Sequence, residues 1–216
     1  MLTEEPLDAD GARALVGDAD GVLQIVSSGA DWAEVTVWNA DGSRAEMSGN
    51  GTRIVARWLA ERAAGPLVVV RVGPREVTCR LLEDGRVEQD MGEVSVHERE
   101  RVAGLDLTPV SVGNPHAVVV GNPDDLPLVG PLLESHPRFP NRTNVQVVRV
   151  DGRGEVTARV WERGVGETSS SGTSAVAVAA ATQREGSVVV HFPGGDLCVR
   201  LEGNRAFLTG RAERVE

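Results

Sequence analysis

The sequence contains no lysine, so its 22 basic residues are all arginine. A Schiff-base mechanism needs a lysine amine, and this absence excludes pyridoxal-phosphate enzymes and lysine-dependent aldolases. Cysteine is almost as scarce, since only Cys79 and Cys198 occur. Two cysteines cannot form a disulfide framework, and each lies in an alternating segment, so we expect both to be reduced thiols in strands.

Several other signals are missing. No apolar run approaches the roughly 18 residues that span a bilayer, and the first residues lack the basic patch and apolar core of a secretion signal. The net charge of −10 argues against nucleic-acid and anionic-membrane partners, because phosphate-binding surfaces need clustered cations. The four histidines lack metal-ligand spacing. We therefore expect a cytoplasmic protein with no metal, no nucleic-acid partner and no membrane partner.

The most informative feature present is an internal repeat. Residues 34–60 read EVTVWNADGSRAEMSGNGTRIVARWLA, and residues 158–182 read ARVWERGVGETSSSGTSAVAVAAAT. Trp38 aligns with Trp161, an offset of 123 residues that continues without a gap through the serine of each copy. Two copies of one supersecondary plan predict two similar domains that arose by duplication.

We place these domains at residues 1–106 and 107–216. Alternation predicts a strand over residues 34–38, and apolar residues at helical spacing predict a helix over residues 53–64. The corresponding helix of the second copy, residues 174–181, is almost entirely alanine and valine, so we expect it to be buried at the centre of its domain.

Each copy carries a serine–glycine motif directly before its helix. Small residues let a ligand approach the backbone closely, and a helix N-terminus presents unpaired N–H groups that bind carboxylate or phosphate. One such motif is most often a plain helix cap. Two copies in related domains favour a ligand site. The motifs are Ser48-Gly49-Asn50 and Ser171-Gly172-Thr173.

Four segments resemble the diaminopimelate epimerase family. WNADGSRAEMSGNGTR and VWERGVGETSSSGTSA are similar to the segments around the two catalytic cysteines of that family, and GNPHAVVV and PNRTNVQVV match two further stretches. Their order and spacing agree from about residue 18 to residue 216. The resemblance implies an α/β (α+β) fold of two pseudo-symmetric domains, each a mostly antiparallel sheet wrapped round a central helix, with substrate in the cleft between them.

The resemblance also implies an activity. Members of the family epimerise LL- to meso-diaminopimelate in lysine biosynthesis, without a cofactor, by proton transfer at the α-carbon. We accordingly expect an isomerase that acts on diaminopimelate or a related small amino-acid or carboxylate substrate, and a chain that pairs as a homodimer.

Roles are implied by position in the family motifs. Ser48 and Ser171 take the catalytic positions, and Glu162 and His116 are the bases available to them. Taken singly, each residue has a plainer reading: Asn114 precedes a proline and suits a turn, and Arg163 suits a surface ion pair. The implied substrate-binding residues are Asn39, Gly49, Asn50, Asn114, Asn144, Arg163, Gly172 and Thr173.

The first departure from the family is serine at both cysteine positions. In the two-base mechanism one thiol removes the α-proton and the other delivers a proton to the opposite face. Free thiols have a pKa of about 8.5, whereas a hydroxyl is far less acidic and needs an adjacent base. Related proline and hydroxyproline isomerases tolerate serine or threonine at one of the two positions.

The second departure lies at the front of the chain. The family opens with a strand bearing a GxGNDF-type motif, whereas this sequence begins near the helix that follows it, residues 8–16. We expect the first domain to lack that strand, and the second to keep its counterpart at residues 110–120. A bare sheet edge promotes aggregation, so we also expect something to cover the edge.

Several functions remain open. The resemblance leaves three alternatives. The first is a diverged but active isomerase, the second is an inactive ligand-binding or scaffold member, and the third is an isomerase or cyclase with another activity in the same cleft. Serines engineered to trap a substrate are disfavoured by the run at residues 169–171, which resembles a natural serine tract. A hydrolytic Ser-His-Asp site is disfavoured because Ser171 lacks the G-x-S-x-G elbow.

Overall fold

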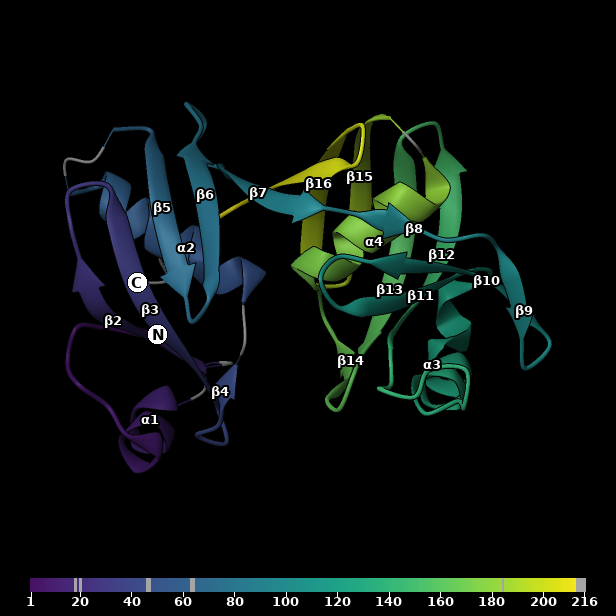
Figure 1. The fold of residues 1–216 in the computed structure, drawn as a ribbon, viewed down its shortest axis with the longest axis horizontal. Coiled ribbons are helices and arrows are strands. Elements are labelled where there is room, and N and C mark those ends of the chain that lie inside the picture. Colours follow the sequence, from purple (N-terminus) through teal and green to yellow (C-terminus); the bar gives the residue numbers. More distant parts are fainter. Residues whose placement is uncertain (18, 20, 46–47, 63–64, 184, 213–216) are drawn as a thin grey trace. The chain divides into compact units, whose positions relative to one another are not determined.

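The fold is known from a computed structural model, in which the chain forms two compact units of mixed α and β structure (Figure 1). The first unit comprises Met1–Gln89 and Gly210–Glu216, and the second comprises Asp90–Thr209. The expected α+β class is confirmed. The structure describes residues 1–17, 19, 21–45, 48–62, 65–183 and 185–212.

The first unit is a sheet with two helices. Its long helix begins at Gly49, four residues before the expected start, because Ser48 caps it, and it ends at Ala60; residues 63–64 of the expected helix lie outside the described part. The elements are β1 (Leu2–Thr3), α1 (Ala9–Val16), β2 (Gly21–Ser28), β3 (Trp32–Asn39), β4 (Arg44–Ala45), α2 (Gly49–Ala60), β5 (Leu67–Val72), β6 (Arg75–Leu81) and β7 (Val87–Glu93), the last of which continues into the second unit.

The second unit repeats this order and adds strands before it. Its elements are β8 (Ser95–Val96), β9 (Glu100–Val102), β10 (Leu105–Ser111), β11 (Pro115–Val120), η1 (Pro123–Asp125), α3 (Leu126–Glu134), β12 (Asn144–Gly152), β13 (Glu155–Glu162), β14 (Gly166–Thr168), α4 (Gly172–Thr182), β15 (Gly186–Phe192), β16 (Gly195–Glu202) and β17 (Arg205–Gly210).

Strand pairing confirms the expected duplication. In the first unit β1 and β2 are parallel, β2 and β3 antiparallel, and β3 and β5 parallel. In the second unit β11 and β12, β12 and β13, and β13 and β15 repeat those three pairings. Even the register is repeated, since Val22 faces Trp38 and Val145 faces Trp161. Most other pairings are antiparallel hairpins, as expected.

The central helix of the second unit is buried on all sides. Every residue from Ser174 to Ala180 is buried, and α4 contacts β10, β11, β12, β13, β15 and β16 (Figure 1). Alanine and valine side chains allow the strands to approach this helix closely from several directions. In contrast, α2 buries one face, which includes Val55, Ala56 and Leu59. The prediction of a buried alanine–valine helix is therefore confirmed.

One expectation about the first unit needs correction. A short strand, β1, does lie where the opening strand was expected to be absent: Leu2 pairs with Leu23 and Thr3 with Gln24, parallel to β2 as β11 is to β12. The expectation failed because Leu2–Thr3 is too short to show alternation. This strand covers only part of β2, and Val26 remains 54% exposed.

The compact units also differ in their bounds from the expected domains 1–106 and 107–216. Strands β8 and β9 pair with β10, so the residues just before 106 belong to the sheet of the second unit. At the other end, the chain returns to the first unit after Thr209. The sequence repeat does not reveal these two features, because both depend on pairing between strands outside the repeated segment.

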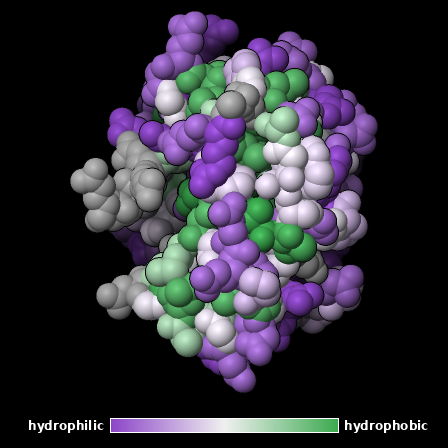
Figure 2. Space-filling model, turned by 90° about the vertical axis from the view of Figure 1, so that its left-hand side faces the viewer, coloured by the Kyte–Doolittle hydropathy of each residue, from purple (hydrophilic) through white to green (hydrophobic). Residues whose placement is uncertain are grey.

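Within the part of the chain that the structure describes, no helix is long and apolar enough to cross a membrane. On the face drawn in Figure 2, hydrophobic residues lie among hydrophilic ones. Mixed surfaces of this kind are usual, because apolar atoms contribute more than half of the accessible area of folded proteins.

Candidate functional site

The candidate site residues of the first unit lie at the N-terminus of α2. Ser48 is the N-cap, and its Oγ accepts a hydrogen bond of 3.0 Å from the backbone N–H of Gly51. Gly49 and Asn50 follow as the first two helical residues, whose N–H groups have no partner within a helix. The predicted anion-binding geometry is therefore present locally, with Ser48 acting as a cap.

The side chain of Arg53 forms hydrogen bonds to the first residues of this helix. Its guanidinium donates to the carbonyl of Gly49 at 3.2 Å, to Oδ1 of Asn50 at 3.3 Å and to Oε1 of Gln89 at 3.1 Å. Arg53 is only 5% exposed, and burial lowers its pKa to about 10. It remains charged at neutral pH, and its charge adds to the positive end of the helix dipole. An arginine inside the apolar pattern of a helix was the available sequence signal, and sequence reasoning missed it.

Asn39 ends β3 and lies in the turn before β4. Its Nδ2 donates to Oγ of Ser43 at 2.9 Å, and its carbonyl accepts from the N–H of Gly42, which has a φ of 80°. Asn39 is exposed. The side chain thus stabilises its own turn, and its Oδ1 makes no hydrogen bond to the described residues.

The candidate site residues of the second unit include the N-terminus of α4. Ser171 is the N-cap, and its carbonyl accepts from the N–H of Ala175 at 2.9 Å, but its hydroxyl makes no capping bond. Gly172 and Thr173 are the first helical residues, in the positions of Gly49 and Asn50. The two serines therefore occupy equivalent positions but differ in hydrogen bonding, since the Oγ of Ser48 accepts a capping bond and that of Ser171 does not.

Glu162 ends β13 and is partly buried. The hydroxyl of Thr168, on the neighbouring strand β14, donates to its Oε1 at 2.6 Å. Burial raises the pKa of Glu162, and the hydrogen bond from Thr168 opposes that rise. A carboxylate with a raised pKa exchanges protons closer to neutral pH, which suits a general acid or base.

Asn144 links two segments of the second unit through its amide. Its Nδ2 donates to the carbonyl of Pro115 at 2.9 Å, and its Oδ1 accepts from the backbone N–H of Arg163 at 3.0 Å. The guanidinium of Arg163 donates to the carbonyl of Asn141 at 3.3 Å, which leaves other donors of this group for a ligand. Asn144 is only 6% exposed, so the geometry suits a residue that shapes the site.

His116 is buried in β11, with 1% of its surface exposed. Its Nε2 lies 2.9 Å from Oδ1 of Asn114, and its Nδ1 lies 3.0 Å from Nε2 of Gln146. Burial lowers its pKa to about 3. A neutral imidazole with both nitrogens occupied suits an orienting role better than that of a base.

The hydrogen bonds therefore join several predicted residues of the second unit. His116 contacts Asn114, and Asn144 connects the start of β11 with the turn that follows Glu162. In the first unit, Arg53 connects Gly49 with Asn50 behind Ser48. Sequence reasoning missed four supporting residues, although each lies within a family-like segment, because their contacts are made only in the folded structure: Arg53, Gln146, Thr168 and Ser174.

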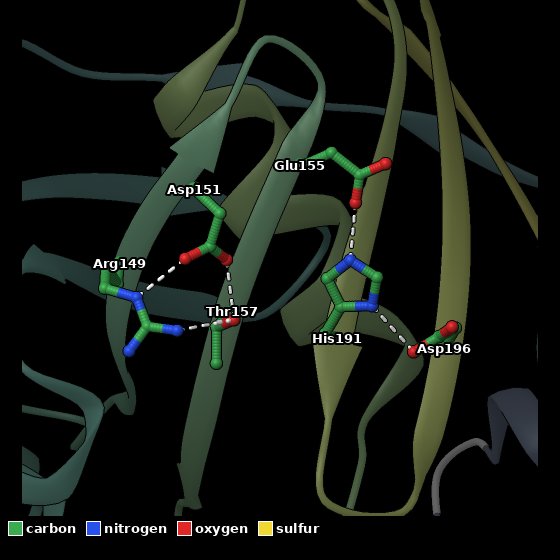
Figure 3. A network of polar contacts seen from close by, with 6 residues as sticks. All are labelled: Arg149, Asp151, Glu155, Thr157, His191 and Asp196. Carbon is green, nitrogen blue, oxygen red and sulfur yellow. Dashed lines mark hydrogen bonds and ion pairs between the residues drawn. The ribbon is translucent and has the colours of Figure 1, made fainter.

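A separate polar network lies on one face of β12, β13, β15 and β16 (Figure 3). His191 lies between Glu155 and Asp196, and Arg149 and Thr157 both bond Asp151. The carboxylates of Asp151, Glu155 and Asp196 outnumber the basic side chains of Arg149 and His191, so the network carries a net negative charge. The part of the chain that the structure describes holds no group of three or more His, Cys, Asp or Glu side chains arranged to bind a metal ion.

Both a family model and individual relatives show that the sequence is similar to diaminopimelate epimerases. The family model described as diaminopimelate epimerase matches residues 11–97 and 108–215. The diaminopimelate epimerase of Pelotomaculum thermopropionicum is 38% identical over 91% of this chain and 81% of its own length. That of Synechocystis is 36% identical over 99% of this chain and 89% of its own length.

Solved structures agree in fold. A predicted epimerase from Pseudomonas aeruginosa superposes with a TM-score of 0.77 at 16% identity, covering 100% of this chain and 90% of the other. A hydroxyproline epimerase from Agrobacterium vitis, solved with bound trans-4-hydroxy-L-proline, gives a TM-score of 0.61 at 18% identity over 97% of this chain and 82% of the other. At these identities the match concerns the fold alone.

Proposed function

The chain belongs to the diaminopimelate epimerase family, and we propose that it is an isomerase that moves a proton at the α-carbon of an amino acid without a cofactor. The proposed substrate is LL-diaminopimelate or a related amino acid. One observation carries the proposal: both duplicated units place a serine at the N-cap of their long helix, where a helix dipole and free N–H groups stabilise negative charge.

The helix termini suit the carboxylate of an amino acid. Gly49 and Gly172 each occupy the first helical position, where no Cβ blocks the approach of an anion. Arg53 adds a buried positive charge next to the N-terminus of α2, and the guanidinium of Arg163, in the second unit, retains donors that its bond to Asn141 does not use. Binding of a carboxylate to a helix N-terminus needs no metal or cofactor.

Proton transfer by serine requires an adjacent base, because an alkyl hydroxyl is a weak acid. Glu162 is the best candidate: it is a partly buried carboxylate whose pKa is raised, and it lies at the end of a strand of the second unit, which also contains Ser171. The proposal therefore assigns acid–base work to Glu162 and an orienting role to His116. Ser48 has no acidic or basic side chain among its described hydrogen-bond partners.

Deuterium incorporation at the α-carbon of diaminopimelate in heavy water tests the proposal. The wild-type chain is compared with a Ser48→Cys/Ser171→Cys double variant, and a Ser170→Cys variant controls for an added thiol near α4. Exchange by the wild type supports the proposed reaction at serine. No exchange by the wild type, with exchange by the double variant, shows a site disabled only at its two acid–base positions.

A second candidate function is ligand binding without catalysis. It is favoured by the hydroxyl of Ser48, which accepts the capping bond expected of a purely structural serine. The same experiment separates the two functions. If neither the wild type nor the double variant exchanges deuterium, while calorimetry still detects binding of a small amino acid or carboxylate, the isomerase proposal is wrong and the binding function stands.

A further inference from the structure

One pair of buried positions is apolar in the first duplicated unit and polar in the second. Leu23 of β2 and Gly51 of α2 correspond, at the constant offset of 123 residues, to Gln146 of β12 and Ser174 of α4. In the first unit the pair is apolar and tightly packed, since a Cβ added to Gly51 would come within 2.6 Å of Cδ2 of Leu23. The fold therefore accepts a leucine–glycine pair at this point between strand and helix.

The second unit has a polar pair in the same place. Gln146 and Ser174 are both fully buried, and Nε2 of Gln146 donates to Oγ of Ser174 at 3.0 Å. Its Oε1 is buried without a hydrogen-bond partner among the described residues. Burial of an amide with an unpaired oxygen is costly. Because the first unit folds with leucine here, packing alone does not require the polar pair.

The amide of Gln146 also contacts His116, and its direction bears on the tautomer of the ring. Nε2 of Gln146 is a donor only, so Nδ1 of His116 accepts and the ring proton lies on Nε2. Nε2 then donates to Oδ1 of Asn114. The Nδ2 group of Asn114 makes no hydrogen bond to the described residues and is left as the donor for a ligand.

We propose that Gln146 and Ser174 are positioning residues, which fix the tautomer of His116 and thereby the orientation of the Asn114 amide. The identity of the ligand rests on the function proposed above. The carboxylate of that amino-acid substrate would accept a hydrogen bond from Nδ2 of Asn114. If the amide of Gln146 were reversed, its oxygen would accept from Nδ1, and Nε2 would accept from Nδ2 of Asn114. Asn114 would then present an oxygen, which repels a carboxylate.

The described part of the first unit lacks the hydrogen bonds that join Ser174, Gln146 and His116, because Leu23 stands in the position of the glutamine. This difference supplies a test variant that preserves packing. Gln146→Leu combined with Ser174→Gly copies the pair Leu23 and Gly51 into the second unit. The variant is expected to fold, because the same strand–helix contact already exists in the other unit.

The first readout is the tautomer of His116, measured by ¹⁵N NMR of the imidazole in histidine-labelled protein. A His116→Gln variant assigns the signal. We expect a neutral ring protonated at Nε2 in the wild type, and tautomer exchange in the double variant. In Gln146→Glu, the carboxylate can only accept, so we expect the proton to move to Nδ1. A wild-type ring protonated at Nδ1, or an unchanged signal in the double variant, overturns the proposal.

The second readout is the KM for diaminopimelate. We expect the double variant to raise KM about tenfold with a smaller change in kcat, because one hydrogen bond to the substrate carboxylate is lost. Gln183→Leu, at the far end of α4, is the matched control and should leave KM unchanged. Unchanged KM in the double variant overturns the positioning role. If the wild type does not turn over diaminopimelate, diaminopimelate is not its substrate, and the NMR measurement alone still decides the inference.

Discussion

The hydroxyl of Thr168 donates a hydrogen bond of 2.6 Å to the carboxylate of Glu162, across the pairing of β13 with β14. This bond lowers the pKa of Glu162, which burial raises. The proton affinity of this carboxylate therefore depends on two opposing effects that can be changed separately by substitution.

Removal of the hydroxyl is expected to move the pH dependence of the reaction. Thr168→Val deletes the bond that lowers the pKa of Glu162, so the carboxylate should lose its proton only at higher pH. If Glu162 acts as the base, the acidic limb of the pH profile of α-carbon deuterium exchange shifts to higher pH. The measurement uses the wild type, or the double cysteine variant if only that exchanges.

A matched control is available in the separate network of Figure 3. Thr157 donates to Asp151 at 2.6 Å, so Thr157→Val also removes a threonine–carboxylate hydrogen bond of the second unit. This variant should leave the pH profile unchanged. An acidic limb that stays in place in Thr168→Val would show that Glu162 does not act as the base.

The two motif serines should differ in their effect on stability. The hydroxyl of Ser48 caps α2, whereas that of Ser171 makes no capping bond. Ser48→Ala is therefore expected to lower the free energy of unfolding by about 1 kcal/mol, and Ser171→Ala by only a few tenths, about 0.3 kcal/mol. Urea unfolding measures both. Equal losses would mean that the difference in capping has no energetic consequence.

Stability should depend on pH through His191. Its hydrogen bonds to Asp196 and Glu155 raise its pKa above the ordinary value, so the folded state binds the proton more tightly than the unfolded state. The resulting stabilisation is fully present below the pKa of the unfolded histidine and is lost as pH rises through the folded value. The side chain is 37% exposed, so the contribution should stay below about 1 kcal/mol.

The measurement compares wild type with His191→Gln. We expect the difference in the free energy of unfolding to be larger at pH 5.5 than at pH 9, and to shrink in high salt, since exposed ion pairs are screened. A difference that is the same at both pH values would show that the two carboxylates do not retain the proton on His191.

Most of the architecture could be predicted from the sequence, because it is encoded in local patterns. Alternation predicted β3, and the alanine–valine run predicted the buried helix α4. The constant offset between Trp38 and Trp161 predicted the duplication that strand register repeats. The short strand β1 was missed, since two residues carry no periodicity and only pairing with β2 defines them.

The candidate site was predictable in part for the same reason. Short motifs placed Ser48 and Ser171 at helix starts, where the structure has them. The supporting residues lie within the same family-like segments, but no local pattern gave them a role. Gln146 lies in a valine-rich strand, and its role follows from contacts with His116 and Ser174, each 28 or more residues away in sequence.

By itself, the sequence determined that two related units exist, that each presents a serine at a helix N-terminus, and that lysine-dependent Schiff-base chemistry is excluded. Only the tertiary structure decided which hydroxyl is committed to capping, that His116 is neutral, and that the pKa of Glu162 is raised. The reason is physical. Helix starts and strand periodicity depend on neighbours in sequence, whereas burial and hydrogen-bond partners depend on residues that folding alone brings together.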